Sequence, residues 1–232
     1  MALESFYPYS FGGSEKSVYQ LSKYLIDSGY NVSIITPDNN GKKNFSMYEN
    51  IKIYYFSSSL NFTKDYEYGL FETPNMNSFE QRLKEINPDI FHLHSFSPSL
   101  NSFHLRKCKE LGISTVFTPR LANNFCINYG ELVYKGKKPC NAKVTFLKCL
   151  SCNLTRFKKS KNQLKKNIII ITTLLFYLVN YFPKRYPLYY LRIWAKKKEL
   201  IRASKYCDKV VAISPWVLKA FSLNNLAFWI AS

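Results

Sequence analysis

The chain has 232 residues, of which 47% are hydrophobic and 17% aromatic, and its formal net charge at pH 7 is +18. This composition excludes an intrinsically disordered chain, and the length is sufficient for a buried core. Much of the positive charge falls between residues 156 and 205, where fourteen lysines and arginines accompany one acid, Glu199. Such a block indicates a surface for phosphate-rich partners, a membrane or nucleic acid, or a solvated basic face with no partner.

The first predicted helix covers residues 14–27. Gly12 and Gly13 form a turn directly before it. Ser14 is its expected cap, and Glu15 lies in its first turn. A glycine turn at a helix N-terminus favours an anion, because unpaired N–H groups and the helix dipole point at the ligand there. The alternative is an ordinary tight turn of any α/β protein.

Beyond this helix, patterns typical of strands and helices alternate. Strands are predicted over residues 31–36, 51–56, 89–94, 114–118 and 209–213, and helices over 78–86 and 100–111. This order indicates one α/β domain over residues 1–232, with a Rossmann-like, doubly wound parallel sheet. Within it, 119–155 is expected to be an irregular, cysteine-containing loop, and 156–205 a basic and apolar helical insertion. Ligands bind such sheets beyond the carboxyl ends of the strands, which places the cleft at the glycine turn and the loop after Thr118.

Two histidines share one predicted strand. His92 and His94 are two residues apart, so both side chains are expected on one face of the sheet. They could form a metal pair, although no third ligand is evident nearby, or they are hydrogen-bonded histidines at a strand end. His104, on the next predicted helix, is expected at the surface.

Four cysteines follow the strand that ends at Thr118. Cys126, Cys140, Cys149 and Cys152 have the spacing C-x13-C-x8-C-x2-C. Four thiols with a terminal C-x-x-C can form a tetrahedral zinc site that fixes a loop. A redox-sensitive clamp and unliganded cysteines are the alternatives.

Residues 168–182 are almost entirely apolar and are flanked by basic residues on both sides. The run is shorter than the roughly 20 residues that a spanning helix needs. It predicts either a segment in the headgroup region of an anionic membrane or a buried helix over the sheet. No signal peptide is evident, so the expected location is the cytoplasm, or the inner face of the plasma membrane as a peripheral protein.

Four ordered segments resemble the N-terminal domain of the family 4 glycosyltransferases, which have the GT-B fold. The first has the family's P-x-x-x-G-G-x-E turn at Pro8, Gly12, Gly13 and Glu15. The others are P-D-I-F-H-L-H-S at 88–95, G-I-S-T-V-F-T at 112–118 and A-S-K-Y-C-D-K-V-V-A-I-S at 203–214. The resemblance covers residues 7–219 and implies the acceptor-side, N-terminal half of a GT-B fold.

The resemblance implies a retaining transfer of a sugar from a nucleotide-sugar to a glycan or lipid-linked acceptor, in surface polysaccharide or glycolipid synthesis. No cofactor is then required for catalysis. The residues that it places in the donor-phosphate and acceptor cleft are Gly12, Gly13, Glu15, His94, Thr118, Arg120 and Ser214. The catalytic residue is unknown, because Arg120 holds the position at which the family often has histidine, and arginine is no proton acceptor near neutral pH.

In the family a second domain binds the nucleotide-sugar, and its acidic E-x(7)-E motif does not follow Ser214. We therefore expect a chain clipped at both ends, without the donor domain and inactive alone unless a separate chain supplies that domain. The alternative is a non-catalytic remnant that binds a membrane or a partner. Nucleic acid is not an expected partner, because no recognisable binding motif accompanies the basic block.

Overall fold

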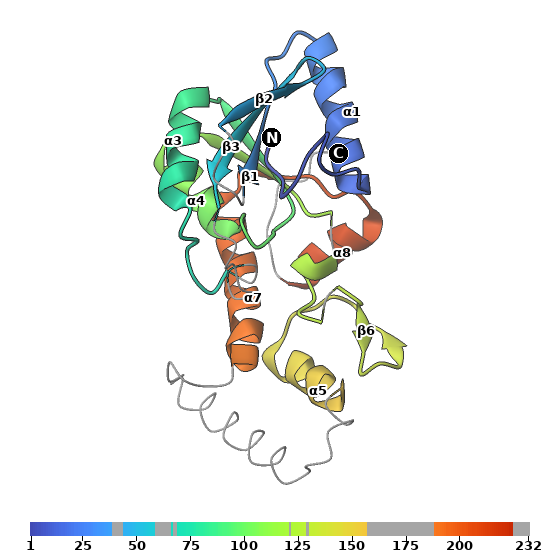
Figure 1. Ribbon diagram of the computed structural model, residues 1–232. Coiled ribbons are helices and arrows are strands. Elements are labelled where there is room, and N and C mark those ends of the chain that lie inside the picture. Colours follow the sequence, from blue (N-terminus) through green and yellow to red (C-terminus); the bar gives the residue numbers. More distant parts are fainter. Residues whose placement is uncertain are drawn as a thin grey trace.

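The computed structural model describes residues 1–38, 44–58, 66, 69–120, 122–128, 130–156 and 188–224, without the side chains of 154–156 and 188–191. A mainly parallel β-sheet forms the upper part of the molecule in Figure 1. Its strands are β1 (Ser33–Asp38), β2 (Phe45–Tyr48), β3 (Ile51–Ser57), β4 (Ile90–His94), β5 (Ser114–Thr118) and β8 (Lys209–Val210). They follow the orders β2-β3-β1 and β4-β5-β8, with every pair parallel except β2 with β3.

The first residues of the chain join the two halves of the sheet. Ala2 forms parallel bridges with Ile35 of β1 and with Leu93 of β4. Its N–H donates to the carbonyl of His92 at 2.8 Å, and its carbonyl accepts from the N–H of His94 at 2.9 Å. The first residues of the chain therefore lie in the middle of the sheet, between β1 and β4.

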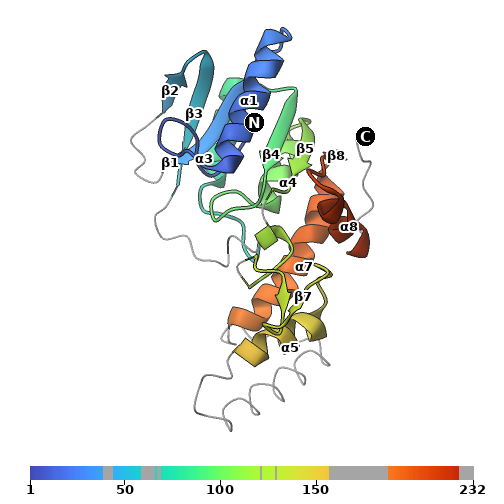
Figure 2. The ribbon, with the colours of Figure 1, turned by 90° about the vertical axis from the view of Figure 1, so that its right-hand side faces the viewer.

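Helices cover both faces of the sheet (Figure 2). Helix α1 (Gly13–Asp27) packs Val18 with Ile34, Ile51 and Ile53 in one core cluster. On the other face, α3 (Met76–Ile86), α4 (Ser102–Glu110) and α7 (Leu188–Tyr206) pack in a second cluster that includes Ile35, Phe56 and Leu93. Neighbouring residues of one strand face opposite sides, which is why the buried run of β1 serves both clusters. The predicted doubly wound, Rossmann-like fold is confirmed.

The predicted elements differ from the observed ones mainly at their ends. The strand predicted over 31–36 is β1 at Ser33–Asp38, and the one predicted over 209–213 is only the pair Lys209–Val210. The prediction omitted β2, a four-residue antiparallel edge strand with exposed Phe45 and Met47. A strand this short, with apolar side chains in water, lacks the buried alternation that marks a strand in sequence.

The segment expected to be irregular has a structure of its own below the sheet (Figure 1). It contains the short 3-10 helix η1 (Ala122–Asn124), the hairpin β6–β7 (Val133–Tyr134 and Lys138–Pro139) and helix α5 (Phe146–Arg156). Phe146 and Leu150 of α5 pack with Ile127 and with Ile193 of α7. This contact between α5 and α7 holds the cysteine-containing segment beside the basic helix.

The carboxyl-terminal part of the predicted 156–205 insertion is helix α7, and α8 (Pro215–Leu223) follows β8. The apolar run 168–182 lies outside the described residues. Among the helices that the structure describes, none combines the length and apolarity that crossing a bilayer requires.

Candidate functional site

The carboxyl edge of the parallel strands gathers most of the predicted site residues. His94 and Thr118 end β4 and β5 and are partners in the strand register, and both are buried. Arg120 follows Thr118 by two residues. The N-terminus of α1 lies at the same edge, because its residue Ser17 contacts Arg120. The topology thus places the glycine turn and the loop after Thr118 together, as predicted.

The glycine turn is built around the carboxylate of Glu15. This carboxylate accepts hydrogen bonds from Ser5 Oγ at 2.8 Å and from Ser10 Oγ at 2.6 Å. Burial acts to raise the pKa of Glu15, but the bonds from Ser10 and Ser5 outweigh it and lower the pKa below its ordinary value. A Cβ on Gly12 would lie 2.5 Å from Glu15 Oε2, so only glycine leaves the carboxylate in this place.

Gly13 has a different environment. It is the first residue of α1, and a Cβ built on it would meet no heavy atom within 4 Å. The predicted Ser14 cap is wrong, because Gly12 occupies the N-cap position and no side chain caps the helix. The first N–H groups of α1 therefore keep the character of an anion site at its open side.

Arg120 connects the sheet edge to α1. Its Nε donates to His94 Nδ1 at 3.1 Å and its Nη1 donates to Ser17 Oγ at 2.7 Å. Its backbone N–H donates to Ser95 Oγ at 2.7 Å. The guanidinium is thus held in one place, one helical turn from the N-terminus of α1, where a fixed cation complements the helix dipole in attracting an anion.

His94 is held in a single tautomer by this contact. Because Arg120 Nε can only donate, His94 Nδ1 accepts and the proton of the neutral ring lies on Nε2. Nε2 is buried and has no hydrogen-bond partner among the described residues. Burial, with smaller contributions from His92 and Arg120, holds the pKa of His94 well below its ordinary value. At neutral pH the uncharged ring is therefore a hydrogen-bond donor and not a general acid.

His92 lies beside His94 on the same face, as the spacing predicts, with the two ring centroids 4.0 Å apart. His92 Nε2 is 2.7 Å from Thr118 Oγ1. Burial lowers the pKa of His92 to about 3, and the charge of Arg120 acts in the same direction. Both rings thus have hydrogen-bonded neighbours, and no cluster of three or more His, Cys, Asp or Glu in the described part of the chain could hold a metal ion.

Ser214 lies at the same carboxyl edge, four residues after β8, as the N-cap of α8. Its Oγ is buried and has no hydrogen-bond partner among the described residues, as is true of Thr36 Oγ1 in β1. Thr36 was not among the residues predicted for the cleft. The two unsatisfied hydroxyls and His94 Nε2 give this edge spare hydrogen-bonding capacity.

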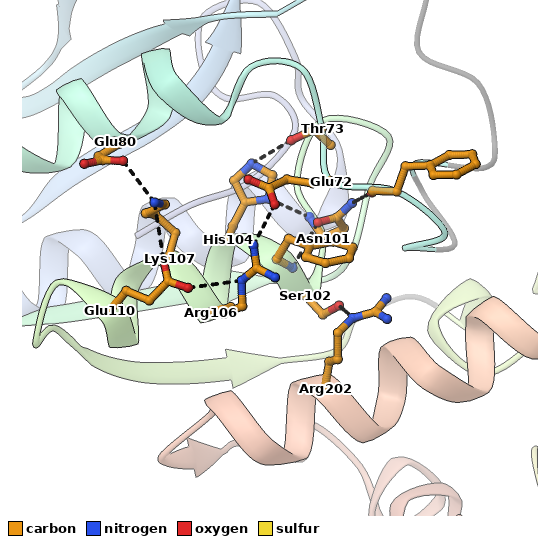
Figure 3. Close-up of polar contacts among 12 residues, drawn as sticks. Glu72, Thr73, Glu80, Asn101, Ser102, His104, Arg106, Lys107, Glu110 and Arg202 are labelled. Carbon is orange, nitrogen blue, oxygen red and sulfur yellow. Dashed lines mark hydrogen bonds and ion pairs between the residues drawn. The ribbon is translucent and has the colours of Figure 1, made fainter.

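The expectation for His104 is wrong, because its side chain is fully buried. Its Nδ1 accepts the N–H of Asn101 at 3.0 Å, and the Asn101 side chain accepts from Phe103 N–H, which together form a capping box for α4. Figure 3 shows this histidine between Thr73 and the start of α4. The N-x-x-H spacing at 101–104 was the signal available in sequence. The residue is structural.

The four cysteines of the 119–155 segment are brought into one region. Cys149 and Cys152 lie one turn apart on α5. Burial raises the pKa of the Cys149 thiol to about 11, with smaller contributions in the same direction from nearby Cys126 and Cys140. Cys152 Sγ instead accepts the N–H of Lys135 at 3.2 Å. In this structure the described thiols do not surround a common point as a metal requires. The zinc site therefore stays a prediction.

The raised pKa of Cys149 predicts slow alkylation. At pH 8 a thiol with a pKa of about 11 is roughly 100-fold less ionised than one with a pKa of 9, and the thiolate is the reacting species. We expect iodoacetamide to label Cys149 about 100-fold more slowly in the folded chain than in the same chain in guanidinium chloride. Equal rates, followed by mass spectrometry, would contradict this. Added zinc that protects all four cysteines together would support the metal site.

Fold and site together define a Rossmann-like domain with a glycine turn and a fixed cation at the ligand-binding edge of its sheet. Residues 11–123 match the family model described as Glycosyltransferase Family 4. This match confirms the resemblance to the N-terminal domain of that family that was noted in the sequence.

Two curated proteins are similar to the chain. A human protein, named as one of the subunits of phosphatidylinositol N-acetylglucosaminyltransferase, is 29% identical over 119 residues, 51% of this chain and 24% of that protein. An uncharacterized 42.6 kDa protein in the cps region of Klebsiella pneumoniae is 24% identical over 176 residues, 70% of this chain and 44% of that protein. The chain thus matches less than half of the length of either relative.

Proposed function

We propose that the chain is the acceptor-side domain of a retaining glycosyltransferase that moves a sugar from a nucleotide-sugar to a glycan or lipid-linked acceptor. The observation that carries the proposal is the bridge from Arg120 to Ser17, which fixes a cation beside the open N-terminus of α1. The family supports sugar transfer in general. The names of the two relatives, one from a glycosyltransferase and the other from a cps region, support a glycan or glycolipid product.

In the proposed reaction the donor diphosphate lies against Gly13 and the guanidinium of Arg120. Negative charge develops on the diphosphate as the sugar leaves, and both the helix N-terminus and a fixed arginine stabilise such charge. Arg120 does not take a proton from the acceptor, because its guanidinium stays protonated. His94 Nε2–H adds a hydrogen-bond donor at this edge. The residues of this chain therefore bind the donor and stabilise charge. The proton that the acceptor hydroxyl loses as it bonds to the sugar goes to the departing diphosphate or to a base outside this domain.

Substitutions of Gly13 and Gly12 are expected to distinguish an effect on ligand binding from an effect on stability. We expect Gly13→Ala to leave the melting temperature unchanged, since a Cβ there has open space, but to weaken the binding of pyrophosphate and of UDP-N-acetylglucosamine. The expected loss is about tenfold, equivalent to one good hydrogen bond. Isothermal calorimetry and NMR shifts of the α1 N-terminus measure it.

Gly12→Ala is the matched variant for the fold. Its Cβ would displace the Glu15 carboxylate from Ser5 and Ser10, and we expect a loss of about 1–2 kcal/mol in the free energy of unfolding. Wild-type chain that binds neither probe, or Gly13→Ala that binds both as tightly as wild type, would contradict the proposed site.

A second candidate is that the domain acts within a complex of several chains. The name of the human relative, which describes it as one of several subunits, favours this alternative. We expect residues 1–232 alone to give no transfer from a panel of nucleotide-sugars to glycan or lipid-linked acceptors. Measured turnover by this chain alone would overturn that expectation. The cytoplasmic location is part of the same proposal, because nucleotide-sugars are the substrates it assumes.

A further inference from the structure

Helix α7 has one face that the described part of the molecule leaves largely exposed. Trp194 and Ile201 are 42% and 44% exposed, which is high for large apolar side chains. Lys197, Lys198 and Lys205 are also exposed. The five residues are spaced by three, four, seven and eleven positions, so they form one stripe along the helix, about 17 Å long. We refer to these five residues as the α7 stripe.

The opposite side of α7 explains why the stripe faces outward. Ile193, Leu200 and Ala203 are buried in the core clusters. Glu199, the one acid of the helix, is completely buried and pairs with Lys196 at 2.9 Å. The packing therefore fixes the orientation of the helix and removes its one negative charge from the surface.

The charges of the α7 stripe are not neutralised within the structure. Lys197, Lys198 and Lys205 form no salt bridge with any other residue that the structure describes. Lys198 Nζ lies 5.5 Å from the ring centroid of Trp194. Beside the stripe is a hollow of about 100 Å³, whose lining includes Lys143, Lys197 and Ile201. The hollow places a fourth lysine next to the stripe.

We propose that the α7 stripe docks on an anionic lipid bilayer. Three unneutralised lysines, with a fourth beside them, match a surface of negatively charged headgroups. Tryptophan favours the bilayer interface, and lysine can extend its ammonium to the headgroups while an isoleucine beside it enters the apolar boundary. Nucleic acid would satisfy the lysines but offers no apolar phase to Ile201. Docking does not depend on the proposed transferase reaction.

Vesicle flotation of the full chain tests the proposal. We expect the protein to float with vesicles of phosphatidylcholine and phosphatidylglycerol and to remain behind with phosphatidylcholine alone. Lys197→Glu/Lys198→Glu should lower the partition coefficient by more than 25-fold, from about fivefold for each lysine lost and a further loss from each acid gained. Lys16→Glu/Lys52→Glu makes the same change of charge on α1 and β3, away from α7, and should have only a small effect (Figure 1).

The apolar residues 168–182 could float the chain by themselves, so insertion of α7 is measured directly. In a Trp216→Phe/Trp229→Phe variant the remaining tryptophan is Trp194. We expect its fluorescence to shift to the blue and to be quenched by brominated lipid. Wild-type protein that does not float, equal loss in both double variants, or an unquenched Trp194 would overturn the proposal. Loss of duplex RNA binding in Lys197→Glu/Lys198→Glu with unchanged flotation would assign the stripe to nucleic acid instead.

Discussion

Lowering the pH from 7.5 to 5 is expected to reduce the free energy of unfolding by about 4 kcal/mol through His92 and His104 alone. Burial lowers the pKa of both side chains to about 3, from 6.5. Between pH 6.5 and pH 3 the unfolded chain therefore binds protons that the folded chain does not, and stability falls as the pH falls. Each group contributes about 2 kcal/mol at pH 5. His94, whose pKa is also lowered by burial, acts in the same direction.

Urea unfolding at intervals between pH 5 and pH 8 measures this effect. We expect an uptake of about two to three protons on unfolding near pH 5.5. The matched variant is His104→Gln, which can still accept the Asn101 N–H but does not titrate, so its proton uptake should be smaller by about one. A free energy of unfolding that stays level from pH 7.5 to pH 5 would show that these histidines are not buried as the structure has them.

Glu199→Leu is expected to cost about 3–5 kcal/mol of stability, because it leaves the Lys196 ammonium buried without its carboxylate. Both side chains are at most 1% exposed. The Glu199 carboxylate also interacts with the charge of Arg202, which donates to Ser102 Oγ at the start of α4 at 3.0 Å. The substitution therefore removes a charge partner of Arg202 as well as the ion pair with Lys196.

The control replaces both partners. Lys196→Met/Glu199→Leu removes the two charges together and fills similar volume, and we expect its stability to lie within about 1 kcal/mol of wild type. Lys197→Met, on the exposed face of the same helix, should change stability by less than about 0.5 kcal/mol. Chemical unfolding of the three variants separates the cost of a buried charge from any general sensitivity of α7. A Glu199→Leu variant as stable as wild type would contradict a buried ion pair between Lys196 and Glu199.

The sequence determined the fold class and the edge at which the site lies. The hydrophobic periods of two residues in a strand and 3.6 residues in a helix are local properties of the sequence. The buried strand β1 and the amphipathic helix α1 could therefore be predicted from the sequence alone. The order of strands and helices then fixed a parallel sheet, whose ligand edge follows from topology. The glycine turn and Thr118 were accordingly predicted at one edge, and the structure places them there.

Only the tertiary structure decided which polar side chains are buried and what they contact. Arg120 and Ser17 are 103 residues apart, and no local pattern reports their hydrogen bond. The basic block looked like a uniform solvated or binding surface, yet the packing of α7 on α4 and the sheet buried Lys196 and Glu199 and exposed the α7 stripe. Helical periodicity shows which residues share a face of a helix, but not which face packs against the rest of the protein. That choice depends on long-range contacts, which exist only once the sheet has assembled.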